Sequence, residues 1–243
     1  MARLVDPRGL RYGVNYDWRV VAKSIKDLDN NVYKDLYFLK YIENIINSKS
    51  FLKKGILYDT AKIYHKSDKV CIDIYLYDSQ YEEIFSKFGK KVESYYKYKL
   101  LRLERLFLLS VLKYYGVEGE LTYYILDNKT LSGEALARYI GIKLSQGFQL
   151  GEAVSDIIKN LNQLIKEKNA IIYGYRISCS GRFTRRQRAS YRNYKEGRLS
   201  LNMVSSFIDY GSKEIFLKYG ACNIKVWLNK SYSTKHYKKR IKI

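Results

Sequence analysis

Residues 207–228 read FIDYGSKEIFLKYGACNIKVWL, and this stretch decides the fold class of the chain. Its β-branched and aromatic runs predict three short strands, with Gly211 and Gly220 at the turns: Phe207–Tyr210, Ile215–Tyr219 and Ile224–Leu228. A fourth strand is predicted before them, where apolar residues alternate with smaller or polar ones: Tyr173, Tyr175, Ile177 and Cys179.

Helices are predicted ahead of these strands. Apolar residues recur every three or four positions over Val32–Ile46, over Tyr81–Tyr115 with a break near Gly89, and over Leu136–Leu150 after a plausible N-cap at Ser132. The next helix carries an apolar stripe made of Ala153, Val154, Ile157, Ile158, Leu161, Leu164 and Ile165. A hairpin is expected between Ile56–Tyr64 and Lys69–Tyr77, joined by residues 65–68, and a further strand at Leu121–Leu126. Helices in one run and strands in another favour an α+β fold over a parallel α/β fold.

Composition limits the function classes. The chain has 243 residues with 45 Lys and Arg against 24 Asp and Glu, a formal net charge of +21, and 47% of it is apolar. Packed cores are therefore possible, a wholly disordered basic tail is excluded, and a polyanionic partner is indicated. Only two His and three Cys are present, so neither a multi-site zinc protein nor a disulfide scaffold is expected, and we expect no metal and no cofactor. Neither a signal peptide nor a membrane-spanning run is apparent.

The positive charge is concentrated in the last 70 residues, and most strongly in residues 180–198, SGRFTRRQRASYRNYKEGR. Arginine offers a planar fork of donors that matches phosphate oxygens, and interleaved tyrosines can stack on bases. The residues we expect to contact RNA are Arg182, Arg185, Arg186, Arg188, Arg192, Lys195 and Arg198, with Tyr191 and Tyr194. A solvated charged loop is the simpler alternative. A basic RNA-processing factor or nuclease and a peripheral membrane protein are two further alternatives, although no catalytic constellation is visible around His65 or His236.

Four blocks in order resemble the C-terminal domain of the bacterial-type small-subunit ribosomal protein S-three family. The matching residues are Ser180, Gly181 and Arg182; Tyr194, Glu196, Gly197, Arg198 and Leu201; Ile208, Asp209, Tyr210 and Gly211; and Tyr219, Gly220, Lys225, Val226 and Trp227. The opening VDPRGLRYGV resembles the family's N-terminus through Pro7, Gly9, Arg11 and Gly13. Ser200, Asn223 and Asp6 depart from the family pattern, which usually has Pro, Gly and His at those positions.

The resemblance implies a type II K-homology domain before the C-terminal domain. Its nucleic-acid loop needs the pattern G-x-x-G, and the nearest match here is Gly89-Lys90-Lys91-Val92, so we expect a degenerate version. The fold expected is thus α+β, with this domain followed by a C-terminal α+β domain around a mainly antiparallel four-stranded sheet. The expected divisions are an extended N-terminal arm (1–18), the K-homology-like domain (19–130), connecting helices (131–172), the RNA-binding domain (173–232) and a basic tail (233–243).

The resemblance also implies a function. We expect a non-enzymatic constituent of the small ribosomal subunit that binds its rRNA in the head near the mRNA entry site, beside the S-ten and S-fourteen families, and that is not a homo-oligomer. Contact with mRNA is expected to be weakened, because Gln149, Leu150, Glu152 and Asp156 stand where family members carry basic residues. Further possible RNA contacts are Arg8, Arg11, Lys90, Lys91, Lys235, Lys238, Lys239 and Arg240. The divergence resembles mitochondrial, organelle-encoded members, with a bacterial cytoplasm or a plastid as alternatives.

Overall fold

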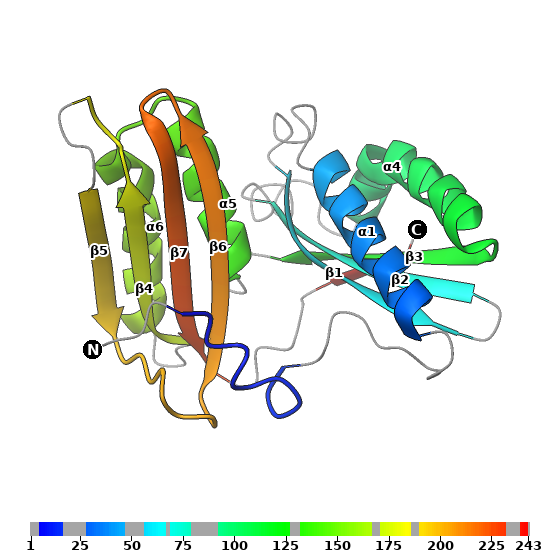
Figure 1. Cartoon of the computed structure of the whole chain (residues 1–243), viewed down its shortest axis with the longest axis horizontal. Coiled ribbons are helices and arrows are strands. Elements are labelled where there is room, and N and C mark those ends of the chain that lie inside the picture. The colour runs from blue at the N-terminus through cyan, green and yellow to red at the C-terminus, as the bar shows by residue number, and fades with distance from the viewer. Residues whose placement is uncertain are drawn as a thin grey trace. The chain divides into compact units, whose positions relative to one another are not determined.

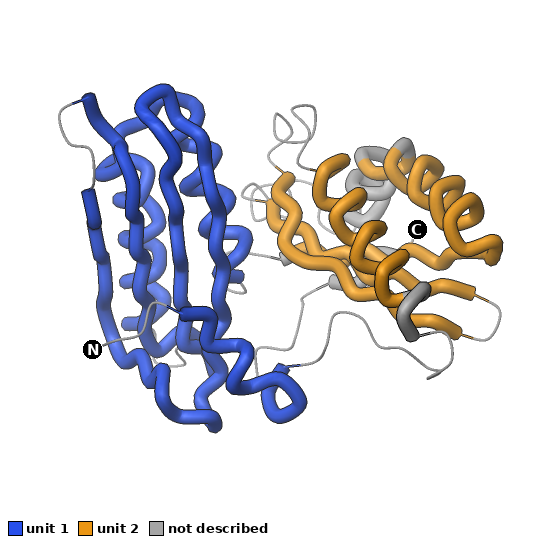
Figure 2. The backbone as a smooth tube through the Cα atoms, viewed as in Figure 1, with its two compact units in different colours: residues 1–17, 129–236 blue, residues 18–128, 237–243 orange. Residues whose placement is uncertain are grey.

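The computed structural model describes residues 5–16, 28–46, 56–66, 69–78, 92–126, 132–166, 171–185, 190–231 and 239–242. The chain forms two compact units (Figure 2). Unit 1 comprises residues 1–17 and 129–236, and unit 2 comprises residues 18–128 and 237–243. Each unit is therefore built from two separate pieces of the chain.

In its described residues, unit 2 is a mixed four-stranded sheet packed against the helices α1 and α4 (Figure 1). The strand order is β1-β2-β3-β8, and the strands are β1 (Ile56–His65), β2 (Lys69–Asp78), β3 (Glu118–Leu126) and β8 (Lys239–Lys242). The pairs β1–β2 and β3–β8 are antiparallel, whereas β2–β3 is parallel. The parallel pair is possible because α4 (Val92–Tyr115) lies between β2 and β3 in the chain.

The helices of unit 2 bury their apolar faces in one core. Phe38, Ile42 and Ile46 of α1 (Leu28–Ile46) join Leu103 and Phe107 of α4 against the strands. The predicted helix and hairpin are thus confirmed. The order helix, hairpin, helix, strand is the one expected for the K-homology domain, which remains a prediction. Gly89, Lys90 and Lys91 of its loop lie outside the described residues.

A buried carboxylate joins three elements of unit 2. Asp35 of α1 is 1% exposed and accepts a hydrogen bond from the Tyr115 hydroxyl of α4 at 2.6 Å. Its other oxygen lies 2.8 Å from Nε2 of His65 in β1. Burial and this bond to Asp35 raise the pKa of Tyr115 above its ordinary value. The contact fixes α1 and α4 over the end of the first strand.

Unit 1 is the predicted α+β domain with a four-stranded antiparallel sheet. The order is β5-β4-β7-β6, with β4 (Ile172–Gly181), β5 (Ser190–Gly197), β6 (Phe207–Leu217) and β7 (Gly220–Lys230). All three pairs are antiparallel. Helices α5 (Gly133–Ser145) and α6 (Leu150–Lys166) cover one face (Figure 1). We call the opposite face of this sheet the open face.

The helices of unit 1 follow the sequence pattern with one correction. Ser132 caps α5 as predicted, because its side chain accepts a hydrogen bond from the Ala135 N–H at 3.0 Å. The expected single helix over residues 136–150 is wrong, since α5 ends at Ser145 and α6 begins at Leu150. Gly147 lies between them at φ +98°, a conformation that ends a helix readily for glycine.

Two strand predictions also change. Phe207–Tyr210 and the first three residues of the predicted strand Ile215–Tyr219 belong to one strand, β6, which ends at Leu217. The fourth strand comes instead from the basic segment as β5. Gly211 does not form a turn. A Cβ on Gly211 would lie 2.3 Å from the Glu134 amide nitrogen, so its lack of a side chain lets α5 approach the middle of the strand.

The two units divide the chain differently from the expected boundaries. The N-terminal arm and helices α5 and α6 belong to the same compact unit as the C-terminal sheet. Helix α6 belongs to this unit because its apolar stripe is buried. The buried residues of α6 are Ala153, Val154, Ile157, Leu161 and Leu164. The end of the basic tail belongs to unit 2, where β8 pairs with β3.

Candidate nucleic-acid interface

The basic segment 180–198 forms the end of β4, a connection and the edge strand β5. Arg182 is half-buried, with Nη2 donating to the main-chain oxygen of Arg185 at 2.9 Å, and Arg185 is exposed. Arg186 and Arg188 lie outside the described residues. Strand β5 is largely exposed along its length.

Because side chains alternate along a strand, β5 divides the predicted cluster between two faces. Arg192 and Tyr194 pair with Cys179 and Ile177, and so lie on the side covered by the helices. The neighbouring Tyr175 marks this side, because its hydroxyl donates to Asn162 Oδ1 of α6. Tyr191 and Lys195 lie on the open face instead. The structure therefore does not bring the predicted contacts into one surface.

The open face carries a cationic cluster centred on Arg176 of β4. Its guanidinium lies over the Trp227 ring at 5.4 Å. Nε donates to Asn193 Oδ1 at 3.1 Å, and Nη2 donates to the Tyr191 hydroxyl at 3.2 Å. These contacts hold the guanidinium between two side chains of β5 and the indole ring of Trp227 on β7. Such a fixed planar cation suits a phosphate or a base, because little further ordering is needed on binding.

Two more cations flank Arg176. Lys195 is its register partner on β5, and Lys225 of β7 is the partner of Ser178 one row along. A hydrogen bond with Ser178 and the charges of Arg176 and Lys225 lower the pKa of Tyr191. The open face thus combines three cations with an aromatic hydroxyl over adjacent strands.

Arg176 and Lys225 were missed by sequence reasoning. Both lie between two apolar residues of a strand in which apolar and polar residues alternate. Arg176 stands between Tyr175 and Ile177, and Lys225 between Ile224 and Val226. The high arginine density in residues 180–198 obscured them. A search for cations at alternating positions of predicted strands would have found them.

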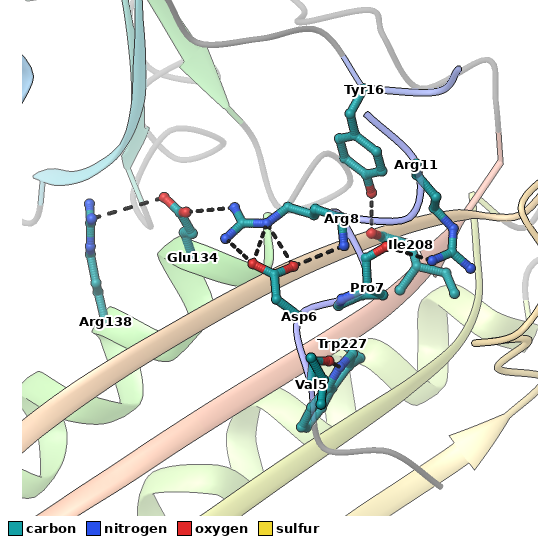
Figure 3. A network of polar contacts seen from close by, with 10 residues as sticks. All are labelled: Val5, Asp6, Pro7, Arg8, Arg11, Tyr16, Glu134, Arg138, Ile208 and Trp227. Atoms are coloured by element: carbon teal, nitrogen blue, oxygen red, sulfur yellow. Dashed lines mark hydrogen bonds and ion pairs between the residues drawn. The ribbon is translucent and has the colours of Figure 1, made fainter. Parts of the chain in front are cut away.

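The N-terminal arm covers the other half of the open face (Figure 3). Nε1 of Trp227 donates to the Val5 oxygen at 3.4 Å, and Trp227 is completely buried. The Tyr16 hydroxyl donates to the Ile208 oxygen, and its ring stacks on Phe207 at 5.0 Å. The arm is therefore part of the packed unit rather than an extended free segment.

Arg11 is buried in the arm, although it was expected as a possible RNA contact. It is 0% exposed. Its guanidinium donates to the main-chain oxygens of Pro7 at 2.7 Å, Met203 at 2.6 Å, and Leu201 and Ser206 at 2.9 Å. Because its donors are engaged within the protein and no surface is accessible, we assign Arg11 to holding the loop 199–206.

Arg8 is likewise engaged inside the unit. It donates to Asp6 and, through Nη1, to Glu134 Oε1 of α5 at 2.9 Å (Figure 3). Its guanidinium also lies over the Tyr210 ring at 5.3 Å. Asp6 thus forms part of an ion-pair network that ties the arm to α5.

The remaining predicted contacts are placed unevenly. Arg198 is exposed just after β5, with its backbone N–H donating to Tyr173 O at 2.9 Å. Lys239 and Arg240 lie in β8, whose backbone pairs with β3. Lys90, Lys91, Lys235 and Lys238 lie outside the described residues.

Across the part of the chain that the structure describes, no three His, Cys, Asp or Glu residues gather where they could hold a metal ion. Within the same ranges, no helix has the length and apolar character needed to cross a membrane.

Comparison with known proteins gives a consistent picture. Residues 140–228 match the family model described as ribosomal protein S3, C-terminal domain. The chain is 25% identical to small ribosomal subunit protein uS3m of Acanthamoeba castellanii, over 94% of this chain and 95% of that protein. It is 27% identical to uS3 of Caldanaerobacter subterraneus subsp. tengcongensis, over 99% and 97% of the two chains. It is 25% identical to uS3c of Euglena longa, over 95% and 100%.

Proposed function

Since the chain is a divergent member of the uS3 family of small-subunit ribosomal proteins, we propose that it binds ribosomal RNA through the open face of unit 1. Its role is that of a structural constituent of the small ribosomal subunit rather than an enzyme. The observation that carries the RNA contact is the fixed guanidinium of Arg176 between Trp227, Asn193 and Tyr191, with Lys195 and Lys225 beside it.

Phosphate contact explains why these cations gather on one face. Each neutralised phosphate releases counterions, so clustered cations gain affinity on a polyanion, whereas they repel one another in the free protein. The exposed cations Arg185, Arg192 and Arg198 extend the same basic end of the chain, and we propose them as further rRNA contacts. Arg186 and Arg188 remain proposals from the sequence.

Salt-dependent binding to a transcript of the small-subunit rRNA head tests the proposal. The double variant Arg176→Gln and Lys225→Gln is expected to bind more weakly at moderate salt. Its slope of log K against log salt should fall by roughly 0.7–0.9 for each phosphate that the variant no longer neutralises. Lys159→Gln is the matched control, because Lys159 is exposed on α6 and belongs neither to the open face nor to the basic segment 180–198. Equal slopes for the double variant and the wild type would contradict the proposal.

The position of the protein within the small subunit is proposed from its family. We propose a position in the head near the mRNA entry site, with proteins of the S-ten and S-fourteen families as neighbours. Exposed Leu106, Leu109 and Leu112 on α4 support a protein contact, because aliphatic surface is better buried against another protein than against RNA. Weakened mRNA contact is supported by α6, where Glu152 is exposed and Asp156 pairs with Lys143 at 3.7 Å.

We also propose that the protein works in a mitochondrial ribosome. The uS3m relative, which matches 94% of this chain, supports this location, as do the 26 tyrosines expected of an AT-rich genome. Native sedimentation of organelle extract with immunodetection tests it. We expect the chain to migrate with small-subunit rRNA and to dissociate only at high salt. A peak at the top of the gradient, free of rRNA, would contradict the ribosomal role itself.

A further inference from the structure

A pocket of about 410 Å³ lies in unit 1 beside the loop that joins β5 to β6. Its lining includes Tyr173 of β4, Arg198, Met203 and Ser205 of the loop, and Phe207 and Lys230 at the ends of β6 and β7. A volume of this size falls within the range of sites that hold small organic groups, roughly 300–1,000 Å³. Arg198 alone among these residues was predicted as an RNA contact.

The pocket wall is held in place by bonds from three directions. Arg198 N–H donates to Tyr173 O at 2.9 Å, and Asn229 Nδ2 donates to Arg198 O at 2.9 Å. The Ser206 hydroxyl lies 2.7 Å from Ser200 O and 2.8 Å from Met203 O, and Arg11 Nη2 donates to Met203 O. A wall fixed in this way is formed before any ligand arrives, which lowers the entropy lost on binding.

The charge of the pocket matches one phosphate. Lys230 Nζ lies 2.7 Å from Asp209, and its side chain is only 8% exposed, so its charge is compensated inside the unit. Arg198 is exposed and forms no ion pair with any residue that the structure describes. One uncompensated guanidinium therefore lines the pocket, next to the exposed hydroxyl-bearing Ser205.

The remaining lining combines the polar Ser200, Ser206 and Asn229 with the apolar or aromatic side chains of Tyr173, Met203 and Phe207. Tyr173 is 48% exposed and Met203 is 54% exposed, while Phe207 is backed by the stacked ring of Tyr16. A free inorganic phosphate would use none of the apolar and aromatic part of this surface. A nucleobase would, because planar bases stack on aromatic and thioether side chains in proteins that bind single strands.

We infer that this pocket takes one unstacked nucleotide of single-stranded RNA. The base lies against Tyr173 and Met203, and the phosphate binds Arg198 and the Ser205 hydroxyl. This assignment rests on the proposed function, since it adds a nucleotide-specific contact to an RNA-binding unit. It differs from the open-face cluster in requiring an exposed base, whereas the cluster needs only phosphates.

The test compares two RNA forms with the full-length protein. A short fluorescent single-stranded RNA and a duplex of the same sequence are titrated with wild type and with Tyr173→Leu, which removes the ring and keeps the backbone bonds of residue 173. We expect about tenfold weaker binding of the single strand and unchanged binding of the duplex, as loss of one base stack predicts. Tyr219→Leu, at the exposed turn before β7, is the matched control and should change neither.

Charge is tested separately. Arg198→Gln should reduce the salt slope for the single strand by about 0.7, whereas Lys218→Gln, at the same distant turn as Tyr219, should leave it unchanged. Crosslinking of 4-thiouridine-containing RNA should also label Tyr173 or Met203 in the wild type. The inference is overturned if Tyr173→Leu binds the single strand like the wild type, or loses duplex binding equally. Displacement of the single strand by uridine monophosphate from wild type but not from Tyr173→Leu would support the assignment, because the mononucleotide and the RNA would then compete for the same pocket.

Failure of this inference can be told from failure of the proposed function. If Tyr173→Leu has no effect while Arg176→Gln with Lys225→Gln weakens rRNA binding, the pocket assignment fails and the open face stands. If the open-face variant also binds normally, the proposed function fails and the pocket loses its premise.

Discussion

Arg11 shows how one residue can match a family motif and serve the fold. Its position in the opening VDPRGLRYG indicated a possible nucleic-acid contact, and arginine is the residue most suited to phosphate. Five donors in a fixed fork also suit a loop whose carbonyls converge, and the loop 199–206 supplies several of them. Sequence pattern cannot separate these uses, because the carbonyl partners lie about 190 positions away.

Replacing Arg11 with Lys should destabilise the protein although the charge is kept. A lysine ammonium cannot reach the diverging oxygens of Pro7, Met203 and Ser206 together, so buried carbonyls lose their partners. We expect the free energy of unfolding in urea to fall by about 2–4 kcal/mol. Arg192→Lys, on the exposed edge strand, should stay within about 0.5 kcal/mol of the wild type. Equal stability of the two variants would contradict this role of Arg11.

Tyr175 provides a pH-dependent test of the covered side of the sheet. It is 2% exposed, and burial, together with the nearby Glu196, raises its pKa to about 12. A raised pKa means that the folded state favours the protonated phenol. The resulting stability is fully present below the ordinary tyrosine pKa of about 10, and it is lost as the pH rises toward 12.

The variant Tyr175→Phe isolates this contribution. Near neutral pH we expect it to be less stable by about 1 kcal/mol, because the hydrogen bond to Asn162 is removed. Between pH 10 and 12 the wild type should lose stability faster than the variant, so the difference in their urea midpoints should narrow. A constant difference over this range would show that Tyr175 titrates as it does in the unfolded chain.

At the scale of elements, glycine decides where sequence reading succeeds. Gly220 closes the predicted turn as the first residue of β7, at φ +142°, whereas Gly211 lies within β6 and permits the close approach of α5. The local sequence predicts a turn at both glycines, because the contact that requires Gly211 is with a helix some 80 positions earlier in the chain. The four-strand count was right, yet one strand came from the basic segment, whose charges hid its alternation.

Gly211→Ala tests this helix–sheet contact. The added methyl would lie 2.3 Å from backbone atoms of Gly133 and Glu134, which cannot move as a flexible side chain would. We expect a loss of about 3 kcal/mol or more in the free energy of unfolding, measured by circular dichroism in urea. Gly151→Ala is the matched control, since nothing lies within 4 Å of its Cβ position at the start of α6. A small loss at both sites would show that α5 can shift without cost.

The candidate site divides in the same way. Charge composition predicts that the C-terminal third contacts RNA, and residues of β5 are among the predicted contacts although no strand was predicted there. Which of these residues share a face follows only once β5 is known to be a strand. The central cation, Arg176, lies on the neighbouring strand β4, opposite Lys195 of β5. Electrostatic composition can therefore predict the end of the chain that meets RNA, but the surface itself requires the sheet.

At the scale of the whole molecule, each end of the chain belongs to a different unit from the residues that adjoin it in sequence. Residues 1–17 pack with 129–236, and residues 237–243 belong with 18–128. A linear division by composition cannot find this arrangement, because it assumes that neighbours in sequence fold together. One consequence is that unit 1 is complete only when the arm covers Trp227, which is otherwise part of an unshielded apolar surface.

The arm should therefore bind in trans. A fragment of residues 129–236 contains Trp227 as its only tryptophan, because the other of the two is Trp18. Without the arm we expect a red-shifted tryptophan emission and lower stability. Addition of a peptide of residues 1–17, which has no tryptophan, should shift the emission back to the blue in a saturable titration. The same peptide carrying Arg11→Lys should bind more weakly, since it lacks the bonds to the loop 199–206. A fragment with buried Trp227 and no response to the peptide would mean that the sheet closes its open face without the arm.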